Sequence, residues 1–97
     1  MTMSADKPIR KGFHTVTPYL VVDHLPEFLV FLQQAFGAEE TLRAPGSAGG
    51  THVELRIDDS MVMVGGAPGA PGAPIAIHLY VPDADAVYEQ ALAAGAT

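Results

Sequence analysis

The strongest constraint on the fold is a unit that occurs twice: an apolar extended segment, an aspartate, a helical pattern and a glycine. The first copy is Tyr19–Glu40, YLVVDHLPEFLVFLQQAFGAEE, and the second is Ile77–Thr97, IHLYVPDADAVYEQALAAGAT. β-Branched and aromatic residues favour strands, aspartate favours a helix N-terminus, and glycine favours a helix end. With Val21 aligned to Val81, both copies show the same order of elements. The second copy is therefore interpreted as the beginning of a repeated module.

Strands are also predicted between the two units. Segment THVELRID (51–58) alternates, so Val53, Leu55 and Ile57 point to one side of a strand and its polar residues to the other. Segments HTVTPYLVV (14–22), EETLRA (39–44), SMVMVGG (60–66) and PIAIHLYVP (74–82) are predicted as further strands. Pro18 has no N–H to donate, which predicts that the first strand either lies at an edge of the sheet or carries a bulge there. The predicted order is β-α-β-β-β, a linker, and β-α.

The first predicted helix has an apolar stripe and clear ends. Asp23 is its expected N-cap and Gly37 its expected end. Val30 and Phe31 are apolar but lie outside the stripe. They either pack beneath neighbouring strands or form a subunit contact, and the pattern alone does not choose between these. The second helix is expected to be capped by Asp83 or Asp85.

These elements predict an α+β chain with a repeated organisation. We expect a flexible tail over 1–12, a βαβββ module over 13–65, a linker over 66–74, and a partial second module (βα) over 75–97. The linker is predicted from its alternating glycine, alanine and proline, a composition that suits neither helix nor strand interior.

Charge and composition exclude several functions. The net charge is −6, with 11 acidic against 5 scattered basic residues, so no basic surface suited to nucleic acid is expected. The sequence has no cysteine, which excludes disulfides and thiolate metal sites. No apolar run is long enough for a signal peptide or a membrane span. These features predict a cytoplasmic protein that contacts neither membrane nor nucleic acid.

The βαβββ unit followed by the start of another resembles the vicinal oxygen chelate superfamily, which includes glyoxalase I, bleomycin-resistance proteins and extradiol dioxygenases. The segments that carry the resemblance are HTVTPYLVV, AFGAEE, HVELRIDDSMVMV and IHLYVPDADAVYEQALAAGA, and they look most like PhnB-like bacterial members. The resemblance implies two modules whose sheets enclose a cup. Here the last three strands of a second module are absent. We therefore expect a truncated chain that associates, as a homodimer, through its exposed sheet edge.

The resemblance also implies a metal site that can be tested residue by residue. Glu54 falls where the superfamily has a carboxylate ligand. The positions that correspond to ligands in the two first strands hold Val16 and Ala76, which cannot bind a metal. Because a stable site needs several donors, no cofactor is expected, with a divalent metal on Glu54 the remaining option.

The ligand-binding candidates are Glu54, Arg56, His78 and Tyr80, all expected on the inner face of the cup. Glu54 either pairs with Arg56 or His52, or serves ligand recognition, metal binding or general acid/base catalysis. A carboxylate in a partly apolar cup is expected to have a raised pKa.

Three functions remain open. The first expectation is a protein that binds a small amphipathic molecule in a cup formed by paired modules. The alternative is a metal-dependent lyase or dioxygenase acting on a vicinal-oxygen substrate, so whether the chain is an enzyme is left undecided. The third is a fragment with no activity of its own.

Overall fold

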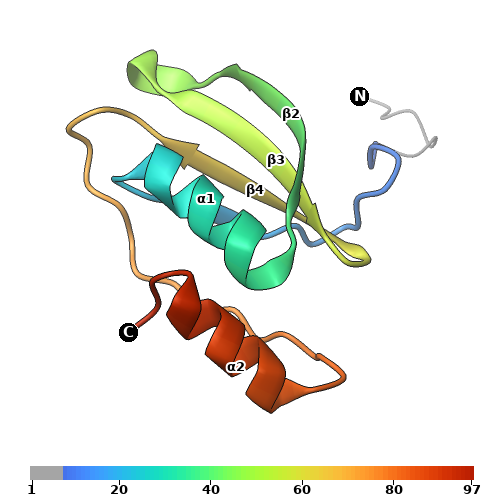
Figure 1. Cartoon of the computed structure of the whole chain (residues 1–97). Coiled ribbons are helices and arrows are strands. Elements are labelled where there is room, and N and C mark those ends of the chain that lie inside the picture. Colours follow the sequence, from blue (N-terminus) through green and yellow to red (C-terminus); the bar gives the residue numbers. More distant parts are fainter. Residues whose placement is uncertain (1–7) are drawn as a thin grey trace.

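The computed structural model describes residues 8–97 (Figure 1). Its elements, in chain order, are β1 (Tyr19–Val21), α1 (Leu25–Phe36), β2 (Glu39–Pro45), the 3-10 turn η1 (Ser47–Gly49), β3 (Thr51–Ile57), β4 (Ser60–Gly66) and α2 (Ala84–Ala93). This order confirms the predicted α+β class and its βαβββ module. Of the expected tail, residues 1–7 lie outside the described residues.

The strands form one four-stranded sheet in the order β1-β4-β3-β2. Strands β2, β3 and β4 are antiparallel neighbours, whereas β1 runs parallel to β4. Strand β1 is thus an edge strand, which is one of the two alternatives that Pro18 predicted. The carbonyl of Pro18 still accepts a hydrogen bond from the Met63 N–H at 2.9 Å, so the proline adds an acceptor to the sheet without having to supply a donor.

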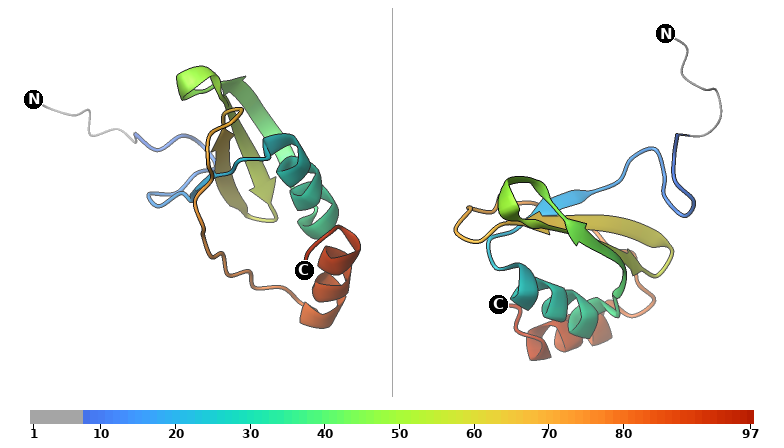
Figure 2. Two further views of the ribbon diagram at one scale, coloured as in Figure 1. Left: turned by 90° about the vertical axis from the view of Figure 1, so that its left-hand side faces the viewer. Right: turned by 90° about the horizontal axis from the view of Figure 1, so that it is seen from above.

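Helix α1 covers one face of the sheet (Figures 1 and 2). Leucines at helical spacing make its buried side, together with Ala35. Alternate residues of the strands form the other half of the core, and the ladder register brings them together in rows: Leu20, Val64 and Val53 in one row, Val62 and Leu55 in the next. Each fully buried side chain of this size contributes about 1.5–3 kcal/mol.

The two apolar residues outside the stripe of α1 have different surroundings. Phe31 packs against the core and meets the Phe36 ring edge to face, with centroids 5.7 Å apart. Val30 remains 48% exposed. Phe31 therefore packs within the chain, and a subunit contact stays a prediction for Val30.

The ends of the helices follow the sequence with one correction. Gly37 ends α1 in the left-handed conformation, with φ +67°. The N-cap of α1 is His24, not the predicted Asp23, because the first helical hydrogen bond runs from the Phe28 N–H to the His24 carbonyl (3.0 Å). For α2, Asp83 is the cap: its Oδ1 accepts from the Ala86 N–H at 3.1 Å.

Helix α2 lies alongside α1 (Figure 2). The Gln90 side-chain amide donates to the Gln34 carbonyl at 2.8 Å, which ties the two helices together. No residue of α2 is buried. Within residues 8–97, neither helix has the length and apolar character needed to cross a lipid bilayer.

Two strand predictions were wrong: one strand is shorter than predicted, and the other does not form in the described chain. The strand predicted over 14–22 is reduced to β1, and residues 14–18 form a loop. The segment 74–82 forms no ladder with any strand of the described chain. Alternation gives a segment strand propensity, but a strand forms only where a neighbour completes its hydrogen bonds. Among residues 8–97, the backbone hydrogen bond that links this region to the sheet runs from the Ala73 N–H to the Val21 carbonyl, at 3.0 Å, just before the predicted strand.

Candidate functional site

The face of the sheet opposite α1 carries the polar groups, and we call it the open face. Alternation along β3 places its buried aliphatic residues toward α1 and Glu54 away from it. The ladders align Tyr19 of β1, Met63 of β4, Glu54 of β3 and Leu42 of β2 across this face. The open face therefore combines an aromatic ring, a thioether and an aliphatic side chain with one carboxylate.

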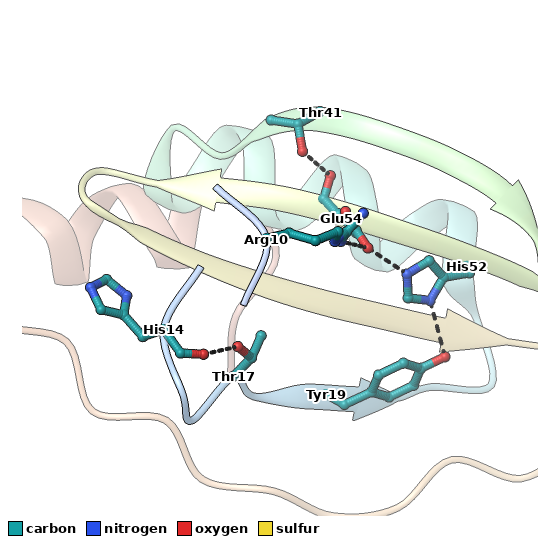
Figure 3. A network of polar contacts seen from close by, with 7 residues as sticks. All are labelled: Arg10, His14, Thr17, Tyr19, Thr41, His52 and Glu54. Atoms are coloured by element: carbon teal, nitrogen blue, oxygen red, sulfur yellow. Dashed lines mark hydrogen bonds and ion pairs between the residues drawn. The ribbon is translucent and has the colours of Figure 1, made fainter. Parts of the chain in front are cut away.

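Glu54 is the centre of a polar network (Figure 3). It is buried, at 4% exposure, and its Oε2 accepts hydrogen bonds from Arg10 and from His52 Nε2, the latter at 2.9 Å. The other His52 nitrogen, Nδ1, lies 3.3 Å from the Tyr19 hydroxyl. A neutral His52 that donates to Glu54 through Nε2 accepts the Tyr19 O–H at Nδ1. Four side chains thus form one chain of polar contacts.

Local backbone features hold this network in place. Gly65 lies opposite His52 in the ladder, and a Cβ there would collide with the Tyr19 ring. The glycine therefore allows Tyr19 to reach across β4 to His52. On the other side, the β2 ladder is interrupted between Glu40 and Leu42, and the Thr41 hydroxyl donates to the Glu54 carbonyl at 3.2 Å.

Arg10 comes from outside the sheet, from the segment that precedes β1 (Figure 3). The Phe13 N–H donates to the Arg10 carbonyl at 3.0 Å, which closes a turn containing Gly12 at φ +88°. The guanidinium also lies over the Phe13 ring, 4.5 Å from its centroid, in a cation–π contact. Sequence reasoning assigned Arg10 to the tail and missed this contact, since the partners are 44 positions apart.

The pKa of Glu54 is shifted in the direction opposite to the expected one. Burial raises the pKa of the Glu54 carboxyl, but the hydrogen bonds from His52 and Arg10, and the charge of Arg10, lower it by more. The pKa is therefore below its ordinary value, and the expected raised pKa was wrong. Glu54 is a fixed anion at neutral pH and a poor proton donor.

The other candidate residues lie apart from Glu54. Arg56 shares the open face but pairs with Glu39 of β2, at 3.5 Å. The rings of His78 and Tyr80 contact each other edge to face, with centroids 4.7 Å apart, in the unpaired segment before α2. Of the two predicted partners of Glu54, the structure brings His52 to it and not Arg56.

The donors around Glu54 do not fit a metal centre. Within residues 8–97, no three histidine, cysteine or carboxylate side chains gather closely enough to hold an ion. Val16 is 83% exposed in the loop before β1, and Ala76 lies in the unpaired segment. Only His52 and Glu54 come together, and Arg10 already occupies the shared oxygen.

A groove also lies on the helix side, between the start of α1 and the end of α2. It is lined by Val22, Asp23, His24, Glu27, Phe28, Phe31, Ala94 and Gly95. Its two carboxylates are exposed and have no network comparable to that of Glu54. The open face remains the better candidate site.

Comparison with known proteins places the fold. No protein-family model matches the sequence. The FosX fosfomycin resistance protein of Listeria monocytogenes, in complex with Mn(II) and sulfate, superimposes with a TM-score of 0.63 at 20% identity, over 84% of this chain and 71% of that one. FosX from Mesorhizobium loti gives 0.61 at 17% identity, over 84% and 70% of the two chains. FosX proteins belong to the vicinal oxygen chelate superfamily.

The chain has the vicinal oxygen chelate fold. It is also 41% identical, over 95 residues, to uncharacterized proteins of Mycobacterium bovis and Mycobacterium tuberculosis. The matched part is 84% of this chain but 62% of the M. bovis protein and 56% of the M. tuberculosis protein. This chain thus spans little more than half the length of these curated relatives.

Proposed function

We propose that this chain is a member of the vicinal oxygen chelate superfamily, of the PhnB-like kind, that binds a small amphipathic molecule on its open face. The observation that carries the proposal is one buried, ionised carboxylate set among apolar side chains. Glu54 lies in a row with Tyr19 and Met63, and neighbouring Met61 is 9% exposed. The flexible methionine side chains can adapt to the apolar part of a ligand, and the carboxylate of Glu54 can bind its polar part, so the two together suit an amphipathic ligand.

Binding is favoured over metal-dependent catalysis by the chemistry of Glu54. A carboxylate with a lowered pKa is a weak base, and its Oε2 already accepts hydrogen bonds from Arg10 and His52. The metal-dependent alternative requires further ligands in place of Val16 and Ala76. Elemental analysis of the purified protein distinguishes the two: one equivalent of manganese, nickel, zinc or iron would overturn the binding proposal.

We further propose that the cup is completed by a second copy of the chain. Ile75 and Ile77 are 48% and 45% exposed in a segment of strand-like sequence that has no partner strand in the described chain. Pairing of this segment with a second copy would satisfy its backbone and bring His78 and Tyr80 to the inner face. In that arrangement 13–65 and 75–97 act as the module and partial module, joined by the linker 66–74.

The binding proposal is tested by NMR titration with phenol, benzamide, benzamidine and benzoate. At least one is expected to shift the amides of β3 and β4 while leaving α2 unchanged. Met63→Lys, which puts a charge into the apolar row, should weaken binding. Tyr88→Lys, at a 63% exposed position of α2, is the matched control. Shifts confined to the helices, or equal effects of the two variants, would contradict the proposal.

The pairing proposal is tested by size-exclusion chromatography with light scattering. The chain is expected to elute as a dimer, and Ile77→Asp is expected to give a monomer because it places a charge in the pairing segment. Tyr88→Asp, at a 63% exposed position of α2, is the control and should leave the mass unchanged. A monomer at all concentrations would refute the pairing.

A further inference from the structure

The Glu54 network contains one member that the sheet does not supply. Tyr19, His52 and Glu54 stand on ladder-paired strands, but Arg10 reaches them from the loop ahead of β1 (Figure 3). The side chain of Glu54 is 5% exposed, whereas that of Arg10 is 53% exposed. The site is therefore built into the sheet, and its cation lies at the surface.

Arg10 uses only part of what the carboxylate offers. The hydrogen bonds from Arg10 and from His52 both end on Oε2. Among residues 8–97, no donor hydrogen-bonds to Oε1. Since every fully buried side-chain nitrogen and oxygen atom of this part of the chain has a partner, Oε1 is not fully buried. A guanidinium can bind a carboxylate through two parallel hydrogen bonds, one to each oxygen. Glu54 thus has room for a better-placed cation than Arg10.

The segment that carries Arg10 is held loosely. Its backbone and hydroxyl hydrogen bonds are internal: Phe13 to Arg10, and the Thr17 hydroxyl to the His14 carbonyl at 3.0 Å. Residues 8–12 and 14–16 are exposed and join no strand. Between residues 8 and 17, the Arg10–Glu54 ion pair is the one polar tie to the sheet in the described chain. Loss of that ion pair would leave the segment without a polar contact to the sheet in the described chain.

We propose that Glu54 binds the guanidinium or amidinium group of a small ligand, and that Arg10 is the internal competitor that such a ligand displaces. This inference rests on the proposed function, since it names the ligand class of the open face. The apolar row beside Glu54 takes the body of the ligand, and the segment 8–17 is a strap that leaves when the ligand enters.

Competition predicts a measurable gain when Arg10 is removed. If the ion pair is formed in about 70–90% of molecules, its loss raises the affinity for an external cation by about three- to tenfold. Loss of the carboxylate charge, in Glu54→Gln, should weaken that affinity at least about tenfold, because the charge-assisted hydrogen bonds disappear. Lys11 is the matched control, as a neighbouring exposed cation with no ion pair to the described residues.

The test is isothermal titration calorimetry of the whole chain with benzamidine, and with benzamide as its neutral isostere. Benzamidine is expected to bind more tightly than benzamide, Arg10→Gln to tighten benzamidine binding, and Lys11→Gln to leave it unchanged. Equal affinity for the two rings would refute selection of a cation and leave the proposed function standing. Weaker binding to Arg10→Gln would show that Arg10 belongs to the site rather than competing for it. Binding of neither ring would overturn the displacement of Arg10, and the proposed function would fall with it only if phenol and benzoate also leave the amides of β3 and β4 unshifted.

Discussion

The fully buried Leu55 offers the sharpest test of the packing. It lies at 0% exposure on β3, with β2 and β4 on either side and α1 above. Leu55→Ala removes most of this side chain at a place where backbone on three sides opposes collapse. Substitutions of this type lower the free energy of unfolding by about 2–5 kcal/mol, and for this enclosed position we expect a loss of about 3–4 kcal/mol. The total free energy of unfolding of a domain is about 5–15 kcal/mol.

The expected loss corresponds to roughly a 300-fold rise in the unfolding equilibrium constant, and to a melting temperature lower by about 15–25 °C. Urea unfolding followed by far-ultraviolet circular dichroism measures it, because the chain has no tryptophan. Leu42→Ala, at a 37% exposed position of β2, is the control and should cost less than about 1 kcal/mol. Similar losses for the two variants, or a loss below about 1 kcal/mol for Leu55→Ala, would refute the described core.

Three further predictions concern charge and helix ends. The pKa of the Glu54 carboxyl is lower in the folded than in the unfolded chain, so the unfolded chain binds the proton more tightly. The free energy of unfolding should therefore fall as the pH drops from the pKa of the unfolded carboxyl through that of the folded one. Urea titrations from pH 7 to pH 3 should show this fall reduced in Glu54→Gln, and less reduced in Glu40→Gln, whose carboxyl is more exposed and held by Arg43. Gly37→Ala should cost about 1 kcal/mol in the same assay, because a Cβ is unfavourable at φ +67°, and an unchanged stability would contradict the left-handed cap. Asp83→Ala should cost about 1 kcal/mol locally, seen as faster amide hydrogen exchange in α2 with the sheet unchanged; equal acceleration in β3 would argue against a local cap.

Short-range patterns predicted the fold well. The alternation of Val53, Glu54 and Leu55 reports directly which face of β3 is buried, since side chains alternate across a strand. The leucine stripe and Gly37 likewise identify α1 and its end, because a helix is defined by contacts within a few residues. These predictions depend on local geometry, and the structure confirms them.

Contacts between distant segments were not predictable in the same way. Nothing near Arg10 in the sequence indicates that it meets Glu54, because that contact arises from the path of the loop before β1. The pairing of His52 with Glu54 was one of the predicted alternatives, but the sequence did not choose between His52 and Arg56. The segment 74–82 has the residues of a strand but no partner strand in the described chain, and the sequence pattern of one segment does not reveal whether a partner strand lies beside it.

The parallel pairing of β1 with β4 also dictates an order of assembly. Strands β3 and β4 are joined by a tight turn between Ile57 and Ser60, and hairpins of this kind form within microseconds. Strand β1 instead pairs Tyr19 with Met63, a contact that requires closure of a long loop through α1, β2 and β3. During synthesis β1 leaves the ribosome first but waits for β4 before it can dock. We therefore expect Arg10 to reach Glu54 only after β1 has docked on β4.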